Sequence, residues 1–366
     1  MTNDESSPLA VTQNPYIQSG LPIREPADLF GRKREIGEIL NFLQFKQCIS
    51  VTGARRIGKT SLLYHVSDPS TLESYGIDPN QLLFVFREIS CDQFGELDAN
   101  AVLRKMLEEA QTKVREAGYD VAEVIAPSDE LSFFDFSEAL GALTATGVTL
   151  VFLFDNFEYL ARNEAIGPAF FSGLRAIANH LDVAYLTASR RPLLELTYTD
   201  RSVLGSPFFN IFATVKLGPF EEPVARELIE GPSAASGVRF SDATVEFLLG
   251  LADHHPYYLQ VACFHAFEMQ SEKGELSEQD YDELSAGVAR AVEDDINLIW
   301  NSELTEQEKK LLNSSRSNWH DPTYHDLIQS LNDQGVVCMR DDVYQLCDLW
   351  VAYLDIEEAA GEQSVS

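Results

Sequence analysis

Cysteine, lysine and long apolar runs are scarce in this chain of 366 residues. The five cysteines are scattered, odd in number and free of any C-x-x-C pair, so their spacing indicates neither a zinc site nor a disulfide framework. Only 9 of the 27 basic residues are lysines. The longest clear apolar run, Val148–Phe154, is much shorter than the roughly 20 residues of a membrane-spanning helix.

Basic residues are outnumbered by acidic ones, 27 against 58, and the net charge is −31. A surface this negative repels nucleic acid except at a local basic patch. The N-terminus is polar and carries no apolar segment of the kind found in signal peptides. We therefore expect a cytoplasmic protein that does not enter membranes and for which nucleic acid is a disfavoured partner.

Residues 53–60 form a complete G-x-x-x-x-G-K-[ST] phosphate loop, Gly-Ala-Arg-Arg-Ile-Gly-Lys-Thr. A short apolar segment typical of a buried strand precedes the loop, and a helical pattern follows it, which together make an anion site. Lys59 would reach the β- and γ-phosphates of a nucleotide, and the Thr60 hydroxyl would ligate Mg²⁺. The residues expected to bind the nucleotide here are Gly53, Ala54, Arg56, Ile57, Gly58, Lys59, Thr60 and Ser61.

The segments around this loop predict an α/β fold. Apolar strands alternate with helical patterns as far as residue 217, which favours a doubly wound parallel sheet. We expect a P-loop NTPase domain over 25–217, an all-α lid over 218–300 and a C-terminal winged-helix domain over 301–356. Residues 1–24 are expected to form a disordered or extended arm, and residues 357–366 an acidic tail.

A carboxylate ends the apolar strand expected at 148–155. Asp155 would hold Mg²⁺ in the manner of a Walker B aspartate, and its alternative role is to cap the following helix. Many ATPases of this kind place a glutamate next, where this chain has Asn156. An amide can orient a water molecule but cannot accept a proton at neutral pH. Either Glu158 substitutes as the base or turnover is slow, and a slow ATPase acts as a switch.

Arg190 follows the next expected strand, over 183–189, at the edge where ligands of such sheets bind. A cation there can sense the γ-phosphate, because charge on the transferring group must be neutralised. The alternative is a salt bridge at the sheet edge. The sequence leaves both roles open.

Together these motifs resemble the STAND and AAA+-type P-loop ATPases, especially prokaryotic ones near the origin-recognition ATPases. The resemblance spans roughly residues 25–350 and implies binding of ATP or ADP with Mg²⁺. It further implies that the segment before the first strand lines the adenine pocket, that a proline at a lid-helix start packs on the base, and that a neighbouring histidine lies close to the phosphates. The matching residues are Phe30, Gly31 and Arg32 for the pocket, with Pro256 and His255 from the lid.

In ATPases of this kind, ADP holds the lid and the winged helix closed, and exchange for ATP permits association. The resemblance therefore implies a nucleotide-dependent switch with slow Mg²⁺-dependent hydrolysis, which associates with a protein partner or with itself in the ATP state. The alternative is a DNA-binding ATPase that reads DNA with its winged helix. Residues 301–366 hold 4 basic against 13 acidic residues, which disfavours that alternative.

Overall fold

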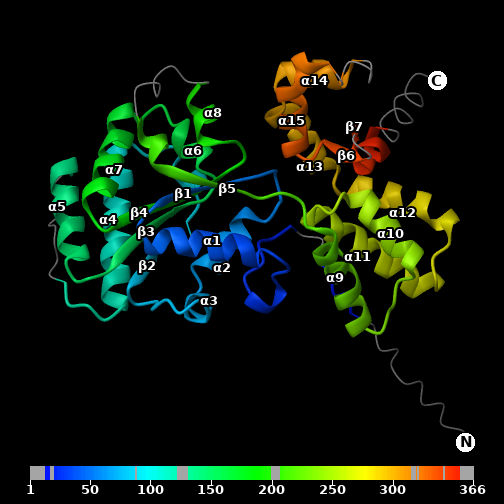
Figure 1. The fold of residues 1–366 in the computed structure, drawn as a ribbon, viewed down its shortest axis with the longest axis horizontal. Coiled ribbons are helices and arrows are strands. Elements are labelled where there is room, and N and C mark those ends of the chain that lie inside the picture. The colour runs from blue at the N-terminus through cyan, green and yellow to red at the C-terminus, as the bar shows by residue number, and fades with distance from the viewer. Residues whose placement is uncertain are drawn as a thin grey trace, which may run out of the picture. The chain divides into compact units, whose positions relative to one another are not determined.

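The computed structural model describes residues 13–16, 20–86, 89–121, 131–198, 207–314, 319, 321–340 and 343–354. These residues belong to two compact units (Figure 1). One unit is Leu21–Gly218, and the other combines Met1–Gly20 with Pro219–Ser366. The chain therefore passes from one unit to the other twice.

The Leu21–Gly218 unit is built on a parallel sheet whose five described strands have the order β2-β3-β4-β1-β5. The strands are β1 (Cys48–Thr52), β2 (Leu82–Val85), β3 (Thr149–Phe154), β4 (Val183–Ser189) and β5 (Phe212–Lys216). Every residue of β1, β2 and β4 is buried, as expected when helices cover both faces of a parallel sheet. The predicted α/β sheet is thus confirmed.

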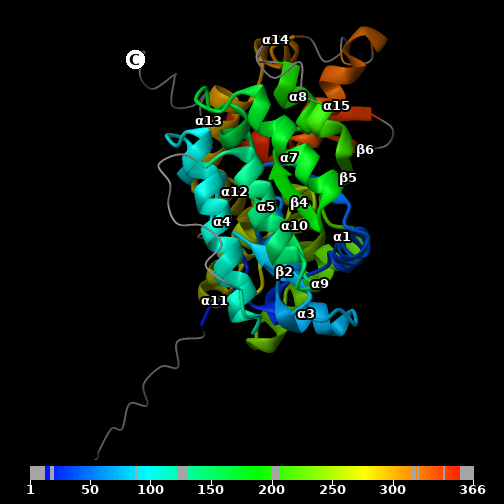
Figure 2. The ribbon, with the colours of Figure 1, turned by 90° about the vertical axis from the view of Figure 1, so that its left-hand side faces the viewer.

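Helices cover the two faces of this sheet in two layers (Figure 2). Alternate residues of β3 enter different cores, Phe152 on one face and Leu153 on the other. The first core contains residues of α4, α5 and α7, and the second contains residues of α1, α2 and α3. The helices of this unit are α1 (Lys33–Gln44), α2 (Lys59–Val66), α3 (Pro69–Ser74), α4 (Ala99–Glu116), α5 (Phe133–Thr144), α6 (Glu158–Ala161), α7 (Pro168–His180) and α8 (Leu193–Tyr198), with the shorter η1 (Pro26–Asp28), η2 (Cys91–Phe94) and η3 (Pro207–Ile211).

The apolar segment over residues 82–89 predicts a strand, whereas β2 ends at Val85. Phe86 has a φ of 69°, which lies outside the extended region. Its ring is buried against Phe94, Phe152 and Phe154. Burial of the Phe86 ring thus accompanies the turn that ends β2. Residues 87–88 lie outside the described part of the chain.

The Pro219–Ser366 unit is mostly helical in its described part. Its elements are α9 (Glu222–Ala235), α10 (Asp242–Ala252), α11 (Pro256–Lys273), α12 (Glu278–Ala291), α13 (Glu293–Leu298), η4 (Ile299–Glu303), α14 (Glu306–Leu312), η6 (Pro322–Tyr324), α15 (His325–Asp333), β6 (Val337–Arg340) and β7 (Val343–Leu346). The sequence pattern predicts a single helix over about 277–300, whereas the structure breaks it at Val292, where ψ is 6°. Three acidic residues in the first turn of α13 favour this restart, because carboxylates stabilise a helix N-terminus. None of the described helices is long and apolar enough to cross a membrane.

Two helices, α14 and α15, and a β-hairpin follow η4 in this unit. α14 begins with a capping box in which Thr305 and Glu308 bind each other's backbone N–H groups, as its sequence predicts. β6 and β7 then pair antiparallel, with Cys338 opposite Gln345. The turn expected at residues 341–342 lies outside the described residues. The interpretation of these elements as a winged helix, and of α9 to α13 as a lid, stays a prediction.

Part of the N-terminal arm is packed on the helices of the same unit. The Asn14 side chain donates hydrogen bonds to the Phe264 carbonyl (3.0 Å) and to Glu268 (2.7 Å). Tyr16 is buried, and its hydroxyl donates to the carbonyl of Ile229 in α9. Residues 13–16 are therefore fastened to α9 and α11, while residues 1–12 lie outside the described residues.

Candidate nucleotide-binding site

The phosphate loop lies between β1 and α2 and needs glycine at two positions. A Cβ atom at Gly53 would lie 2.6 Å from the carbonyl oxygen of Leu217, which is closer than real Cβ atoms approach. Gly58 has a φ of 99° and sits directly before α2, where other residues are strained. The loop therefore brings its backbone to the N-terminus of α2, where unpaired N–H groups attract anions.

The Lys59 ammonium lies beneath this loop. It donates hydrogen bonds of 2.8 Å to the carbonyl oxygens of both Gly53 and Ala54, and only 7% of the residue is exposed. The buried Arg32 contacts the same loop from outside, since its guanidinium donates to Ile57 (3.1 Å) and to Gly218 (2.8 Å). The structure thus places Arg32 against the loop backbone, and its expected contact with adenine stays a prediction.

The expected metal ligands lie side by side. The Thr60 hydroxyl donates a 2.7 Å hydrogen bond to Oδ2 of Asp155, whose Oδ1 accepts 3.0 Å from the N–H of Asn156. Burial raises the pKa of the Asp155 carboxyl, while the hydrogen bonds from Thr60 and Asn156 oppose the shift. A hydroxyl and a carboxylate held together at the N-terminus of α2 suit a hard cation such as Mg²⁺, which prefers oxygen ligands.

A cavity of about 100 Å³ adjoins these two residues. Ser90 and Gln93 contribute to its lining and are functional candidates that the sequence analysis missed. Ser90 follows β2 and pairs with Asp155 in an isolated parallel bridge, so it lies beside the expected metal ligand Asp155. Its place after the strand next to β3 is the signal that could have found it, because ligands of parallel sheets bind at the strand carboxyl ends.

Asn156, the residue at the expected glutamate position, has a left-handed backbone with a φ of 51°. Asparagine adopts this conformation more readily than most residues. Its amide nitrogen donates 3.0 Å to the hydroxyl of Ser90. The side chain is therefore tied to the loop after β2, close to both Asp155 and the adjoining cavity.

The remaining two catalytic candidates bind each other. Glu158 in α6 is 3% exposed, and its Oε1 accepts a 2.5 Å hydrogen bond from Nε of Arg190. Its Oε2 is buried and accepts no hydrogen bond from any residue that the structure describes. The salt bridge considered for Arg190 is thus present, with Glu158 as its partner. Contact of Arg190 with a γ-phosphate stays a prediction.

Comparison with known proteins places this geometry in a family. The family model described as Novel STAND NTPase 2 matches residues 46–309. The chain belongs to this family. The predicted resemblance to STAND ATPases is thereby confirmed, and a nucleoside triphosphatase is the activity that the family name describes. No curated protein sequence matches the chain.

Two solved structures share the fold of this STAND NTPase. The Walker-type ATPase PABY2304 of Pyrococcus abyssi is 16% identical with a TM-score of 0.61, and the match covers 91% of this chain and 97% of that one. The ORC2 protein of Aeropyrum pernix, solved as ADPNP-ADP complexes, is 13% identical with a TM-score of 0.53, and the match covers 92% and 96%. At these identities the likeness shows the fold alone.

The other predicted nucleotide contacts of the STAND NTPase lie in both units. Ser61 Oγ accepts a 2.9 Å hydrogen bond from the N–H of Ile23, so the segment before α1 contacts α2. Phe30 and Gly31, in the same segment, are half-buried. Pro256 begins α11 as expected, and the buried His255 before it stacks on Tyr258. These two belong to the Pro219–Ser366 unit, and their contact with a nucleotide stays a prediction.

Proposed function

We propose that this STAND NTPase is an ATP-dependent molecular switch that hydrolyses ATP slowly with Mg²⁺. One observation carries the proposal. The residue directly after Asp155, which is hydrogen-bonded to Thr60, is Asn156, and an amide cannot accept a proton. The next carboxylate along the chain, Glu158, is buried and bound to Arg190. The residues for binding are thus complete, whereas a glutamate base next to Asp155 is missing from the sequence.

Each residue of the site has a role in this proposal. The loop N–H groups and Lys59 would hold the phosphates, and Thr60 with Asp155 would hold Mg²⁺. The ion would neutralise charge on the γ-phosphate. Asn156 would orient the attacking water without taking its proton, which lowers the rate compared with a carboxylate base. A long-lived ATP state follows, and such a state is what a switch needs.

The switching part of the proposal concerns the other unit. We propose that α9 to α13 form the lid and that α14, α15 and the β6–β7 hairpin form a winged-helix domain. The lid residues Pro256 and His255 would contact the base and the phosphates, and Phe30 with Gly31 would line the adenine pocket. Exchange of ADP for ATP would then change the arrangement and expose a surface for a protein partner or a second copy.

Small-angle scattering and limited proteolysis with each nucleotide test the switch. Protein loaded with ADP and Mg²⁺ should differ from protein loaded with a non-hydrolysable ATP analogue, both in radius of gyration and in cleavage pattern. Lys59→Ala serves as the control, because it should give one pattern with either nucleotide. Identical behaviour of the two loaded wild-type forms, with binding shown by calorimetry, would contradict the switch.

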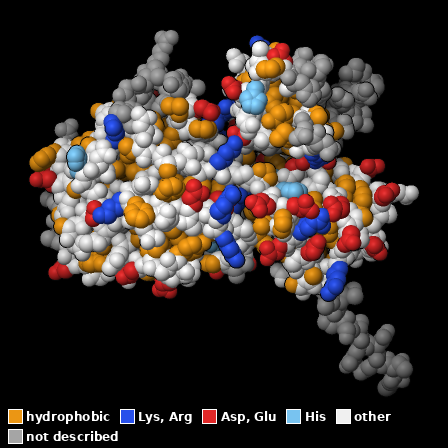
Figure 3. All heavy atoms as spheres, in the orientation of Figure 1, with side chains coloured by type: hydrophobic (Ala, Val, Ile, Leu, Met, Phe, Trp, Pro, Cys, Tyr) orange, Lys and Arg blue, Asp and Glu red, His pale blue; other side chains and the backbone are white. Residues whose placement is uncertain are grey.

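The second candidate, a DNA-binding ATPase, gains little from the structure. α15 carries Asp326 and Asp333 but neither lysine nor arginine. On the face shown in Figure 3, acidic side chains also crowd the surface around α9 and α10. We therefore expect random duplex DNA to keep its electrophoretic mobility at low salt in the presence of the protein. A clear shift would favour the DNA-binding alternative.

A further inference from the structure

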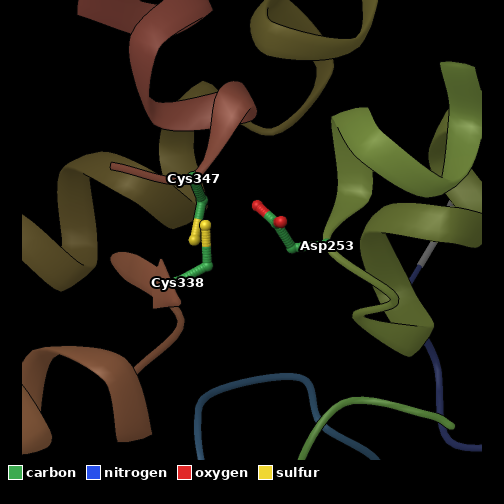
Figure 4. Close-up of side chains that lie close together, drawn as sticks. All are labelled: Asp253, Cys338 and Cys347. Atoms are coloured by element: carbon green, nitrogen blue, oxygen red, sulfur yellow. The ribbon is translucent and has the colours of Figure 1, made fainter. Parts of the chain in front are cut away.

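Two thiols and a carboxylate gather in the Pro219–Ser366 unit, whereas the phosphate loop and the Thr60–Asp155 pair belong to the Leu21–Gly218 unit. The ligand atoms of Asp253, Cys338 and Cys347 all lie within 4.8 Å of one another. Figure 4 shows the two sulfur atoms side by side, with the carboxylate of Asp253 near them. Asp253 follows α10, whereas Cys338 lies in β6 and Cys347 comes directly after β7.

The hairpin register explains why the two thiols meet. Cys338 lies opposite Gln345, and Cys347 is two residues farther along, so both side chains point to the same face of the hairpin. The N–H of Cys347 donates 3.1 Å to the carbonyl of Val336, which continues the ladder beyond β7. The thiols are therefore diagonal neighbours, whose separation is set by backbone hydrogen bonds.

Arg340, two residues after Cys338, holds the carboxylate in place. Its Nη2 donates to Oδ1 of Asp253 (2.5 Å) and to the carbonyl of Gly250 (2.9 Å), while its Nη1 donates to Asp348 (2.8 Å). The other oxygen of Asp253, Oδ2, is buried and has no hydrogen-bond partner among the described residues. A buried carboxylate oxygen without a partner is destabilising, so a ligand that binds it would be stabilising.

The three side chains line a shared cavity of about 380 Å³ together with His254 and His255. This space leaves room for a fourth ligand, either a water molecule or another donor. Two sulfurs and one carboxylate oxygen are an unsuitable set for Mg²⁺ or Ca²⁺, which take oxygen ligands. Thiolates instead select zinc and other soft or borderline metals, which favour four ligands in a tetrahedron.

We propose that Asp253, Cys338 and Cys347 form a binding site for a thiolate-preferring divalent metal ion, with Zn²⁺ as the expected ligand. Binding would convert both thiols to thiolates and release two protons to the solvent. The two thiolates, the Asp253 carboxylate and the divalent ion then sum to a charge of −1, and the Arg340 guanidinium lies between Asp253 and Asp348. The metal would join the end of α10 to the β6–β7 hairpin within one unit.

Co²⁺ titration of the full-length protein, reduced with a phosphine and kept free of oxygen, tests the site. One Co²⁺ per chain should bind and give thiolate-to-cobalt charge-transfer absorption together with the visible bands of tetrahedral cobalt. One equivalent of Zn²⁺ should remove these bands. Absence of charge-transfer absorption under these conditions would overturn the proposal. The same holds if the reduced protein binds no Co²⁺ and only forms a Cys338–Cys347 disulfide after oxygen is admitted.

Matched variants show whether these residues are the ligands. Cys338→Ser and Cys347→Ser should each lose about half of the charge-transfer intensity or all of the binding, whereas Cys263→Ala, in α11 of the same unit, should keep both. Asp253→Asn keeps an oxygen for Arg340 but removes the charge, and it should weaken Co²⁺ binding by at least about 10-fold. An unchanged spectrum in both serine variants would assign the metal elsewhere and overturn the proposal.

Thermal unfolding distinguishes a variant that has lost the metal site from a variant that does not fold. In wild type, excess Zn²⁺ should raise the midpoint, because a ligand that binds only the folded state stabilises it. Each serine variant should retain its helical circular dichroism without metal and lose the Zn²⁺-dependent rise. A rise of equal size in the folded serine variants would contradict the assignment.

Discussion

The carboxyl ends of β1 and β3 lie on the same sheet edge, yet they differ in how completely they match the ATPase pattern. After β1 the whole phosphate loop is present, with Lys59 beneath it and Arg32 against its backbone. After β3 the carboxylate of Asp155 meets Thr60, but Asn156 stands where a glutamate is usual. We therefore expect nucleotide binding and nucleotide turnover to depend on different residues, which mutation should separate.

The largest expected effect is at β1. Lys59→Ala removes a charged hydrogen-bond donor to the phosphates, so ATP affinity should fall by about 100-fold or more. Isothermal calorimetry with ATP measures this directly. Lys105→Ala, which removes a half-exposed lysine of α4, is the matched control and should bind as wild type does. An ATP affinity of Lys59→Ala equal to that of wild type would contradict the assignment of residues 53–60 as a phosphate loop.

The next effect is at β3 and should spare binding. Asp155→Ala would remove the proposed carboxylate ligand of Mg²⁺, so Mg²⁺-dependent turnover should fall by about 100-fold while much of the ATP affinity remains. Phosphate release at saturating ATP and calorimetry on the same preparation separate the two quantities. Wild-type turnover in Asp155→Ala would contradict the assignment of Asp155 as a Mg²⁺ ligand.

A third substitution, at Asn156, should increase ATP turnover instead of lowering it. Asn156→Glu supplies the missing carboxylate, and a positioned base is worth about 100-fold or more, so an imperfectly placed one should still raise turnover by about 10-fold. Asn156→Gln is the control, because it has the same length and the same left-handed backbone penalty without the base. Equal rates for the two variants would show that the residue after Asp155 does not limit hydrolysis.

The smallest effect concerns the pair formed by Glu158 and Arg190. A double-mutant cycle with Glu158→Gln and Arg190→Met should give a coupling energy of about 1 kcal/mol in urea unfolding, because the two side chains contact each other and Glu158 is buried. A coupling near zero would mean that the salt bridge adds little. A loss of ATP affinity in Arg190→Met alone would then favour the phosphate-sensing role.

Local patterns predict much of this protein. The strand β1, the phosphate loop and α2 follow from a buried apolar run, two glycines and a helical pattern, all within a short segment. The capping box of α14 follows from Thr305 and Glu308 in the same way. Each of these features depends on neighbours a few residues apart, which a single sequence displays.

Contacts between distant residues are what the sequence could not predict. Arg32 binds the loop at Ile57 because α1 packs beside β1 and α2. Asn156 binds Ser90 because β2 and β3 are neighbours in the sheet. The turn at Phe86 accompanies the burial of its ring among other aromatic residues. A search for C-x-x-C spacing likewise misses the Cys338–Cys347 neighbourhood, because hairpin register sets it.

The nucleotide that accompanies the freshly purified protein is the most direct test of the central claim. After denaturation, chromatography should find about one adenine nucleotide per chain, mainly ADP, and far less from Lys59→Ala prepared in parallel. Such a result would agree with a site that binds firmly and turns over slowly. A wild-type site that holds no nucleotide and gains none on incubation with ATP and Mg²⁺ would contradict the account.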